Sequence, residues 1–454
     1  MTQETISKLR QISGLAVLTG EQIGADFCHD ELPGSESYAP EAVCEASSTQ
    51  QVSELLRICG CDGVPVTVRG AGTGRAGGSV PVKGGVVLSL RGMDRIIAVD
   101  EAARTMTLQP GVLLQDVKAE AERHGLCYPP DPGEKTATIG GNVSTNASGP
   151  CAGKYGRTAD YVADAEIVLA DGTVTTLGAD EGNRAVVGSE GVLAVVTEVT
   201  LRLIEAPGAS VMLLLPFAES GAALAAAAKI AASDFEPAVL EYMDGALVEF
   251  SGKVTGNPVF PTEADGTPVE ATLMLTLEGA DEDAVESRME EFAEFAEELE
   301  CLDILVGDSL SMKRDFWAAH DAFHTSMEAA KSEAEVNVTL PPERLSDILA
   351  YAKSLGEQGG YQVMAYAHVE SGGVHIHAVS ERPKAEFKEA AEAFCDAVRT
   401  RCAQLGGDAA GEYGVGYANL KYFKGSARHA GLSEAKARLD PAGILNPGKV
   451  VEGC

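Results

Sequence analysis

The stretch PVTVRGAGTGRAGGSVP, from Pro65 to Pro81, decides the fold. A β-rich run ends at Arg69, and a loop with five glycines follows between Gly70 and Gly78. Glycines at this density let backbone N–H groups approach an anion without an intervening Cβ atom, so a pyrophosphate suits the loop, although such a stretch is often only a tight turn. No Gly-Lys-Ser/Thr follows, and the chain then runs to another strand rather than a helix. The stretch is therefore neither a Walker loop nor a Rossmann fingerprint.

Three further stretches share this character. YPPDPGEKTATIGGNVSTNASGP, from Tyr128 to Pro150, supplies small residues and side-chain donors suited to a flat polar ring and its phosphate tail. VVGSEGVLAVVTEVTLRL, from Val186 to Leu203, is a Gly-Ser-Glu-Gly turn that enters a strand. The tail LDPAGILNPGKV, from Leu439 to Val450, has the proline and glycine content of an irregular strap.

Composition narrows the class of protein. The 454 residues are enough for two or three domains, and 45% hydrophobic with 23% charged residues is typical of a soluble globular protein. With 35 Lys+Arg against 68 Asp+Glu, the formal charge of −33 argues against nucleic acid or an anionic membrane as the main partner. The ten cysteines form no CxxC pair, which excludes a ferredoxin-type cluster or a zinc ribbon. The polar N-terminus and the absence of a long apolar run predict a reduced, cytoplasmic protein.

The pattern of elements is α+β. Short strands alternate with glycine and proline up to about Ile204, and EAPGAS (Glu205–Ser210) breaks the pattern. Beyond it, strands and helices alternate as in helices packed on an antiparallel sheet. Helices are expected at Ser53–Cys59, Gln115–Gly125, Ser220–Ser233, Glu282–Leu299, Asp315–Glu333, Glu343–Leu355 and Lys384–Leu405.

Three of the eight histidines fall within ten residues: His368, His375 and His377. A hairpin across the ESGG turn would place His368 on one strand and the other two on the next, with His375 and His377 on one face. Because adjacent strands lie about 4.8 Å apart, two imidazoles can converge on one ion at about 2.1 Å each. Without other context, these histidines could equally be strand residues whose neighbours satisfy them.

Together, the glycine-containing stretches and the tail resemble the FAD-binding vanillyl-alcohol oxidase/PCMH superfamily over about residues 40–452. More narrowly, they are similar to the branch with D-lactate dehydrogenase, the glycolate oxidase FAD subunit and D-2-hydroxyglutarate dehydrogenase. The resemblance implies an α+β fold: a PCMH-type, two-subdomain FAD-binding domain and an α+β substrate (cap) domain with an antiparallel sheet. The expected domains are a lead-in (1–45), the FAD-binding domain (46–206), the cap domain (207–435) and a strap returning to the flavin (436–454).

The resemblance also implies FAD contacts. Non-covalent FAD is expected, because Thr73 stands where some relatives attach the cofactor through a histidine. The pyrophosphate is expected at Arg69, Gly70, Ala71, Gly72, Thr73, Gly74, Gly78 and Ser79, and the ribityl chain and isoalloxazine at Pro130, Thr138, Gly141, Asn142 and Asn146. The adenine half is expected near Glu190, Gly191 and Val196, with Asn446 near the flavin ring.

AHVESGGVH and GEYGVG look like the family's metal-binding stretches, so the resemblance implies that His368, His375 and Glu412 hold one divalent metal: Zn, Fe or Mn. The chain departs from the family around the substrate. Tyr413 follows the metal glutamate in place of a histidine, and His320 and Glu335 replace an arginine and a lysine. Further departures are Ser371, Gly373 and Asn419.

The predicted function is oxidation of a 2-hydroxy acid by hydride transfer to flavin N5 with metal assistance. Tyr413, His375 and His377 are the candidate catalytic residues, and His320, His324 and Lys421 the candidate substrate anchors. Electrons would leave to an electron-transfer flavoprotein, an iron–sulfur subunit or a quinone, and a homo-oligomer is left open. The alternatives are a flavoenzyme for a bulkier, less anionic substrate, including a non-redox addition as in alkyl-glycerone-phosphate synthases, and a non-catalytic FAD subunit.

Overall fold

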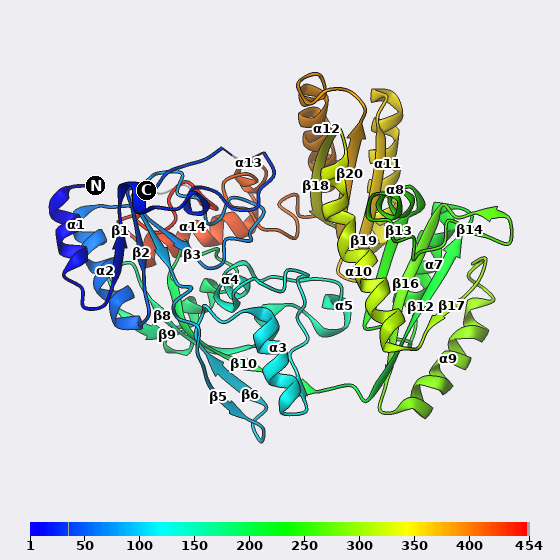
Figure 1. Ribbon diagram of the computed structural model, residues 1–454, viewed down its shortest axis with the longest axis horizontal. Coiled ribbons are helices and arrows are strands. Elements are labelled where there is room, and N and C mark those ends of the chain that lie inside the picture. Colours follow the sequence, from blue (N-terminus) through cyan, green and yellow to red (C-terminus); the bar gives the residue numbers. More distant parts are fainter. Residues whose placement is uncertain (35, 452–454) are drawn as a thin grey trace. The chain divides into compact units, whose positions relative to one another are not determined.

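The computed structural model describes residues 1–34 and 36–451, and the chain divides into two compact units. Of the described residues, the first unit contains 1–34, 36–148, 157–206 and 413–451, and the second contains 149–156 and 207–412. The first unit therefore combines N-terminal and C-terminal segments of the chain, seen as the blue and red segments of Figure 1. Within the described residues, no helix combines the length and the apolar character that crossing a membrane requires.

This division differs from the predicted domains at three points. Residues 149–156, predicted within the FAD-binding domain, belong to the second unit. Residues 1–45 are not a separate lead-in, because β1 and β2 extend the sheet of the first unit and Leu9 is part of its core. The chain also returns to the first unit at Tyr413 rather than near residue 435. The physical reason is that residues after 413 hydrogen-bond within the first unit, as where Val415 donates its N–H to Glu190.

Two sheets form the frame of the first unit. A four-stranded sheet has the order β1-β2-β4-β3, in which β4 pairs in parallel with β2 and β3. A five-stranded antiparallel sheet has the order β5-β6-β10-β8-β9, and β7 pairs with β11. The strands are β1 Ala16–Leu18, β2 Ala42–Glu45, β3 Val66–Arg69, β4 Val86–Ser89, β5 Ile96–Asp100, β6 Thr105–Leu108, β7 Leu126–Cys127, β8 Val162–Val168, β9 Val174–Thr176, β10 Val195–Arg202 and β11 Ile204–Glu205.

Local sequence explains the helices of this unit. Ser48 caps α2 by accepting from the N–H of Gln51, and Gly63 ends it in the left-handed conformation. The apolar face of α2 then packs into the core beneath the parallel strands. The helices that lie in the first unit are α1 Gln3–Arg10, α2 Thr49–Asp62, α3 Leu114–Arg123, α4 Ile139–Thr145, α6 Thr158–Tyr161, α13 Leu420–Phe423 and α14 Ala427–Leu439.

The second unit is built on a seven-stranded antiparallel sheet with the order β17-β12-β16-β13-β19-β20-β18. The predicted histidine hairpin is its β19–β20 pair, with His368 opposite Gly373. A second small sheet pairs β14 with β15. The strands are β12 Ala209–Phe217, β13 Val239–Asp244, β14 Glu263–Ala264, β15 Thr267–Pro268, β16 Ala271–Gly279, β17 Leu305–Gly307, β18 Ser332–Thr339, β19 Gln362–His368 and β20 Gly373–Ser380.

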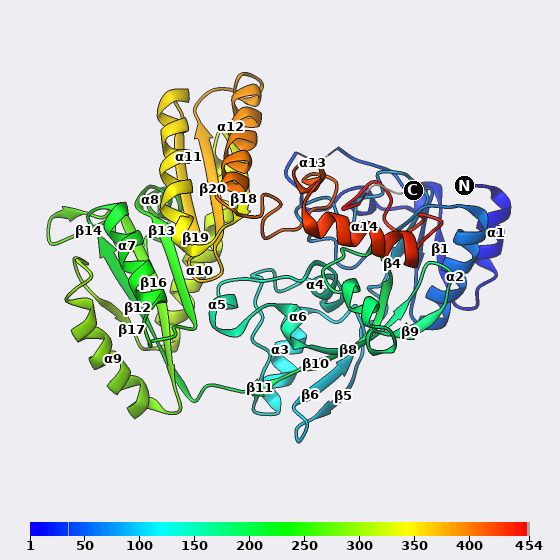
Figure 2. The ribbon, with the colours of Figure 1, turned by 180° about the vertical axis from the view of Figure 1, so that it is seen from behind.

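Helices cover both faces of this sheet. The core on one face includes side chains of α7, α9, α11 and α12, and Figures 1 and 2 show α11 and α12 side by side. The core on the other face includes side chains of α8 and α10. The helices are α5 Ala152–Tyr155, α7 Ser220–Ala231, α8 Gly245–Thr255, α9 Glu282–Ala296, α10 Leu310–Ser326, α11 Leu345–Gly359 and α12 Lys384–Gln404. The helix predicted over Asp315–Glu333 is wrong at its end, because Ser332 and Glu333 pair with β20 as the start of β18.

Candidate functional site

In the first unit, the glycine-containing stretches meet one another. A Cβ added to Gly70 would lie 2.0 Å from the hydroxyl oxygen of Thr138, so the first two stretches touch where only glycine fits. Gly72 and Gly191 have φ values of +84° and +73°, which L-residues rarely adopt. The backbone there is an array of glycine turns of the kind that presents N–H groups to an anion.

Two buried cations lie at this loop. Arg69 donates to the carbonyl of His29 at 2.8 Å, and burial lowers the pKa of its guanidinium. Lys449 donates to the carbonyl of Gly78 at 2.9 Å, and burial lowers its pKa to about 7 against the attraction of Asp30. A positive side chain at each end of the loop suits the charge of a pyrophosphate. The glycine cradle and these cations therefore fit the phosphates of FAD.

Two predicted FAD residues, Glu190 and Asn446, also make hydrogen bonds that join distant parts of the chain. The Glu190 carboxylate is buried and accepts from the N–H groups of Val415 and Gly416 at 2.7 and 2.8 Å. The Asn446 side chain accepts from the Val68 N–H at 3.1 Å and donates to the Glu190 carbonyl at 2.8 Å. These bonds tie β3, the Glu190 turn and the tail together, so the turn and the tail meet beside β3, where the glycine loop begins.

The other predicted FAD residues also lie in the first unit. Thr138 immediately precedes α4, and Asn146 ends this helix in the left-handed conformation while accepting from the Ala159 N–H at 2.8 Å. Val196 is buried in β10, which places it in the core beside the turn. Contacts of individual residues with FAD stay predictions. The remaining members of the set are Ala71, Thr73, Gly74, Ser79, Pro130, Gly141 and Asn142.

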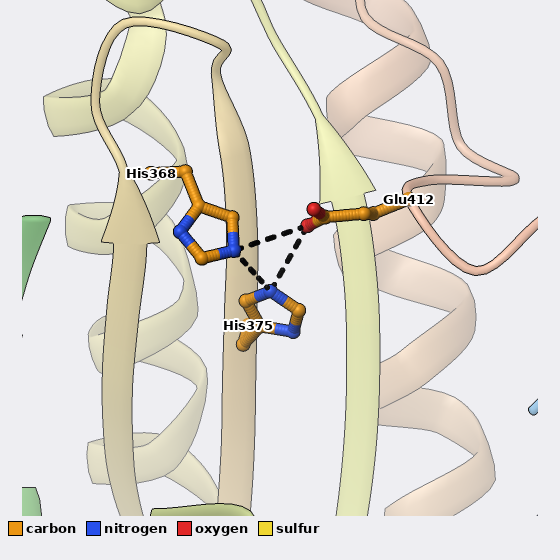
Figure 3. A group of neighbouring side chains, drawn as sticks. All are labelled: His368, His375 and Glu412. Carbon is orange, nitrogen blue, oxygen red and sulfur yellow. Dashed lines mark hydrogen bonds and ion pairs between the residues drawn. The ribbon is translucent and has the colours of Figure 1, made fainter. Parts of the chain in front are cut away.

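In the second unit, His368, His375 and Glu412 converge as the resemblance implied (Figure 3). The two Nε2 atoms of the histidines lie 3.3 Å apart. One Glu412 oxygen, Oε2, lies 3.0 Å from the His375 nitrogen and 3.5 Å from the His368 nitrogen. Ligand atoms held about 2.1 Å from a tetrahedral ion are separated by about 3.4 Å. The triangle therefore has the dimensions of one face of a divalent metal site.

The fold builds this triangle from a hairpin and a turn. His368 ends β19 and His375 lies in β20, so pairing of the two strands brings the rings together. The turn before Glu412 is pinned to the end of β18, since Thr339 and Asp408 exchange backbone hydrogen bonds. A Cβ added to Gly373 would lie 2.7 Å from Glu412 Oε2, so glycine leaves the room that the carboxylate occupies.

Each ligand histidine has a partner on its other nitrogen. His368 Nδ1 lies 2.7 Å from Oε1 of the buried Glu241, and His375 Nδ1 lies 2.7 Å from Oδ1 of Asn337. His320, a predicted substrate anchor on α10, has its Nε2 3.1 Å from the second oxygen of Glu241. His320 therefore contacts the support of a ligand, and its role toward substrate stays a prediction.

The charges around the two rings differ. Burial by itself would lower the pKa of His368, but the Glu241 and Glu412 carboxylates outweigh it and raise the pKa to about 9. Burial dominates at His375 and lowers its pKa despite Glu412. In the hairpin turn, burial also raises the pKa of Glu370 to about 7. The site is thus a buried, predominantly acidic environment that favours a cation.

The remaining candidates are spread over both units. His377 is buried in β20, with Nδ1 2.8 Å from Glu333, and its ring lies 6.4 Å from that of His324. In the first unit, the Arg75 guanidinium lies 5.5 Å from the ring centre of Tyr413, and the ammonium of the exposed Lys421 lies 4.6 Å from the ring centre of Tyr422.

Sequence reasoning missed several polar residues of these two sites. A signal for Glu241 was present, because it is a carboxylate flanked by apolar residues inside the strand VLEYMD. Lys449 was visible only as part of the tail, and nothing local marks its side chain as buried against Gly78. Nothing in the local sequence marks Asn337, yet its amide oxygen lies 2.7 Å from Nδ1 of His375.

These features define a flavin-binding unit joined to a unit with a candidate metal site, and comparison with known proteins assigns the family. Residues 40–178 match the FAD-binding domain family, and residues 206–450 match the C-terminal domain of FAD linked oxidases. The chain belongs to the FAD-linked oxidases, and it is an FAD-dependent oxidoreductase with the PCMH-type fold.

Several relatives have names within the branch predicted from sequence. A D-lactate dehydrogenase of Anaerostipes hadrus is 36% identical and aligns with 99% of this chain and 98% of its own length. The glycolate oxidase subunit GlcD of Bacillus subtilis is 30% identical over 99% of this chain and 97% of its own. Among solved structures, p-cresol methylhydroxylase with substrate bound matches the fold with a TM-score of 0.79 and 17% identity, over all of this chain and 98% of that one.

Proposed function

We propose that this chain oxidises a 2-hydroxy acid of the D-lactate or glycolate kind to the corresponding 2-oxo acid. Relatives named D-lactate dehydrogenase and glycolate oxidase subunit align with nearly the whole chain, which supports this substrate class. When bound, FAD would supply the two-electron acceptor that this oxidation requires. The protein must then hold the substrate and accept the hydroxyl proton.

The metal part of the proposal depends on the triangle of His368, His375 and Glu412, the single observation that carries the mechanism. Two imidazoles and one carboxylate suit Zn²⁺, Fe²⁺ or Mn²⁺ and leave open positions. An ion held there supplies a Lewis acid that favours the ionised form of a substrate hydroxyl. The burial of both histidines keeps water away from these ligand atoms.

The proton acceptor is proposed among Tyr413, His375 and His377. Both ring nitrogens of His375 are engaged, one with Asn337 and one in the triangle, which favours the other two. Tyr413 directly follows Glu412 in the chain, and a tyrosine, with an ordinary pKa of about 10, needs a nearby cation to become a useful base. If a Tyr413→Phe variant reduces its flavin at the wild-type rate, Tyr413 is not the proton acceptor.

Electrons are proposed to leave to a separate acceptor: an electron-transfer flavoprotein, an iron–sulfur subunit or a quinone. The chain's charge of −33 favours a docking partner with a basic surface. If the partner docks through charge, the second-order rate of electron transfer falls steeply as ionic strength rises.

The decisive experiment is anaerobic flavin reduction, followed near 450 nm, against a panel of D- and L-2-hydroxy acids. Bleaching by D-lactate or a close analogue, restored to yellow by an added electron acceptor, is the expected result. A protein that binds FAD yet stays yellow with every member of the panel contradicts the substrate class. A parallel panel of larger alcohols then tests the second candidate.

That second candidate is a flavoenzyme for a bulkier, less anionic substrate, and the side chains near the triangle favour it. The family resemblance implies an arginine and a lysine where this chain has His320 and Glu335, and the Glu335 carboxylate accepts from Asn337 at 3.0 Å. Each missing charge-assisted hydrogen bond weakens the binding of an anionic substrate by roughly 1.5–3 kcal/mol. A role as a non-catalytic FAD subunit is disfavoured, because an inert chain has no use for three converging ligands.

A further inference from the structure

Glu241 occupies an unusual place for a carboxylate. It lies in β13 between Leu240 and Tyr242, and its side chain is fully buried. It is opposite His368 in the pairing of β13 with β19. Its two oxygens contact two different imidazoles, His368 at 2.7 Å and His320 at 3.1 Å. A buried charge of this kind is costly unless it is fully bonded, so this position calls for a specific role.

The bond to His368 determines which nitrogen of that ring carries a proton. An ionised carboxylate only accepts hydrogen bonds, so His368 Nδ1 must donate to Glu241. In the neutral ring, Nε2 then presents its lone pair, and this is the atom that faces His375 and Glu412. The ring is thereby oriented as a metal ligand by the residue behind it.

His375 is oriented by a neutral group instead. Asn337 donates from its amide nitrogen to Glu335 at 3.0 Å, which leaves its amide oxygen to accept from His375 Nδ1. The two ligand rings therefore have matching hydrogen bonds but different charges behind them. Of the two supporting residues, Glu241 is a carboxylate and Asn337 is a neutral amide. The Glu241 charge therefore adds to that of Glu412 in the triangle.

We infer that Glu241 is a positioning residue of the metal centre, which holds His368 in its ligating orientation and strengthens its binding through charge. His320 holds Glu241 from α10 and so acts on the metal through it. This inference rests on the proposed metal site. It goes beyond that site because it assigns roles to Glu241 and His320, which are not themselves ligands of the ion.

The test measures zinc affinity by competition with a fluorescent chelator, using the full chain loaded with FAD. Glu241→Leu removes both hydrogen bonds and is expected to weaken zinc binding about 10–100-fold. Glu241→Gln keeps the shape and an oxygen for His368 Nδ1 but removes the charge, so a smaller loss, below about tenfold, is expected. His320→Leu should fall between wild type and Glu241→Leu.

The matched control is Asp244→Asn, in the same strand. Asp244 is also buried, and it accepts from Tyr242 at 2.6 Å and Lys353 at 2.8 Å rather than from a ligand histidine. This variant should lower the melting temperature yet change zinc affinity by less than twofold. The inference is overturned if Glu241→Leu and Glu241→Gln both bind zinc as tightly as wild type, or if Asp244→Asn weakens binding equally. A wild-type chain that binds no zinc, iron or manganese contradicts the proposed metal site itself, and this inference with it.

Discussion

Lys436 offers the sharpest test of how the tail is held in the flavin-binding unit. Its ammonium is buried and contacts the Asp440 carboxylate at 2.5 Å. It also donates to the carbonyl oxygens of Leu445 and Val192, at 2.7 and 2.9 Å. One side chain of α14 thus joins the start of the tail, its middle and the turn that precedes β10.

Lys436→Met keeps the aliphatic stem and deletes the charge. The variant leaves Asp440 as a buried carboxylate whose remaining bonds come from the Ile444 and Leu445 N–H groups. Breaking a buried ion pair by removing one partner costs about 3–5 kcal/mol in the free energy of unfolding. For a unit of 150–250 residues, each kcal/mol lowers the melting temperature by about 2–4 °C, so a fall of about 10 °C is expected.

The assay is thermal unfolding with excess FAD, followed by circular dichroism and by the rise in flavin fluorescence on release. The control is Arg438→Met on the same helix, because Arg438 pairs with Asp180 at 3.3 Å on the surface. Exposed pairs contribute less than about 1 kcal/mol, so this variant should melt within about 3 °C of wild type. The reasoning is refuted if Lys436→Met melts as wild type does, or if both variants lose the same stability.

Three further outcomes are expected. Gly70→Ala should reduce FAD occupancy at least tenfold, because its Cβ would lie 2.0 Å from the Thr138 hydroxyl, and a variant that binds FAD normally would contradict the proposed loop. His368→Ala should reduce bound metal from about one equivalent per chain to almost none while FAD is retained, whereas unchanged metal content would place the ion elsewhere. Burial lowers the pKa of Lys449 to about 7 from an ordinary value near 10.5, because the folded state disfavours the protonated side chain. Stability from this group is therefore full above about pH 10.5, where the side chain is neutral in both states, and it is lost progressively as the pH falls toward and through 7. Urea unfolding of the FAD-free protein between pH 7 and 9 should therefore show stability that rises with pH, by at most about 1.4 kcal/mol per unit, and Lys449→Met should remove that part of the slope.

Local sequence was enough to predict the family, the glycine loop and most of the elements. The spacing of His368 and His375 around a glycine turn predicts a hairpin, and β19 and β20 pair as such a spacing requires. The long helix expected from Lys384 to Leu405 is α12, Lys384–Gln404. These features depend on periodicity and turn chemistry, which act between residues that are near one another in the chain.

Competition between local and long-range preferences explains where such reasoning failed. The residues before Glu333 have helical propensity, and α10 does run to Ser326. Pairing with β20 then draws residues 332–339 into the sheet, where Val336 and Val338 are buried. Tertiary packing overrode propensity at that point.

The sequence alone was enough to predict FAD binding and to place two histidines on the paired strands of a hairpin. Only the tertiary structure decided what lies behind those histidines. Alternation along a strand tells which face a residue occupies, whereas the order β13-β19-β20-β18 decides which strands are neighbours. Glu241 meets His368 from 127 positions away, and Asn337 meets His375 from 38, because the sheet places their strands side by side.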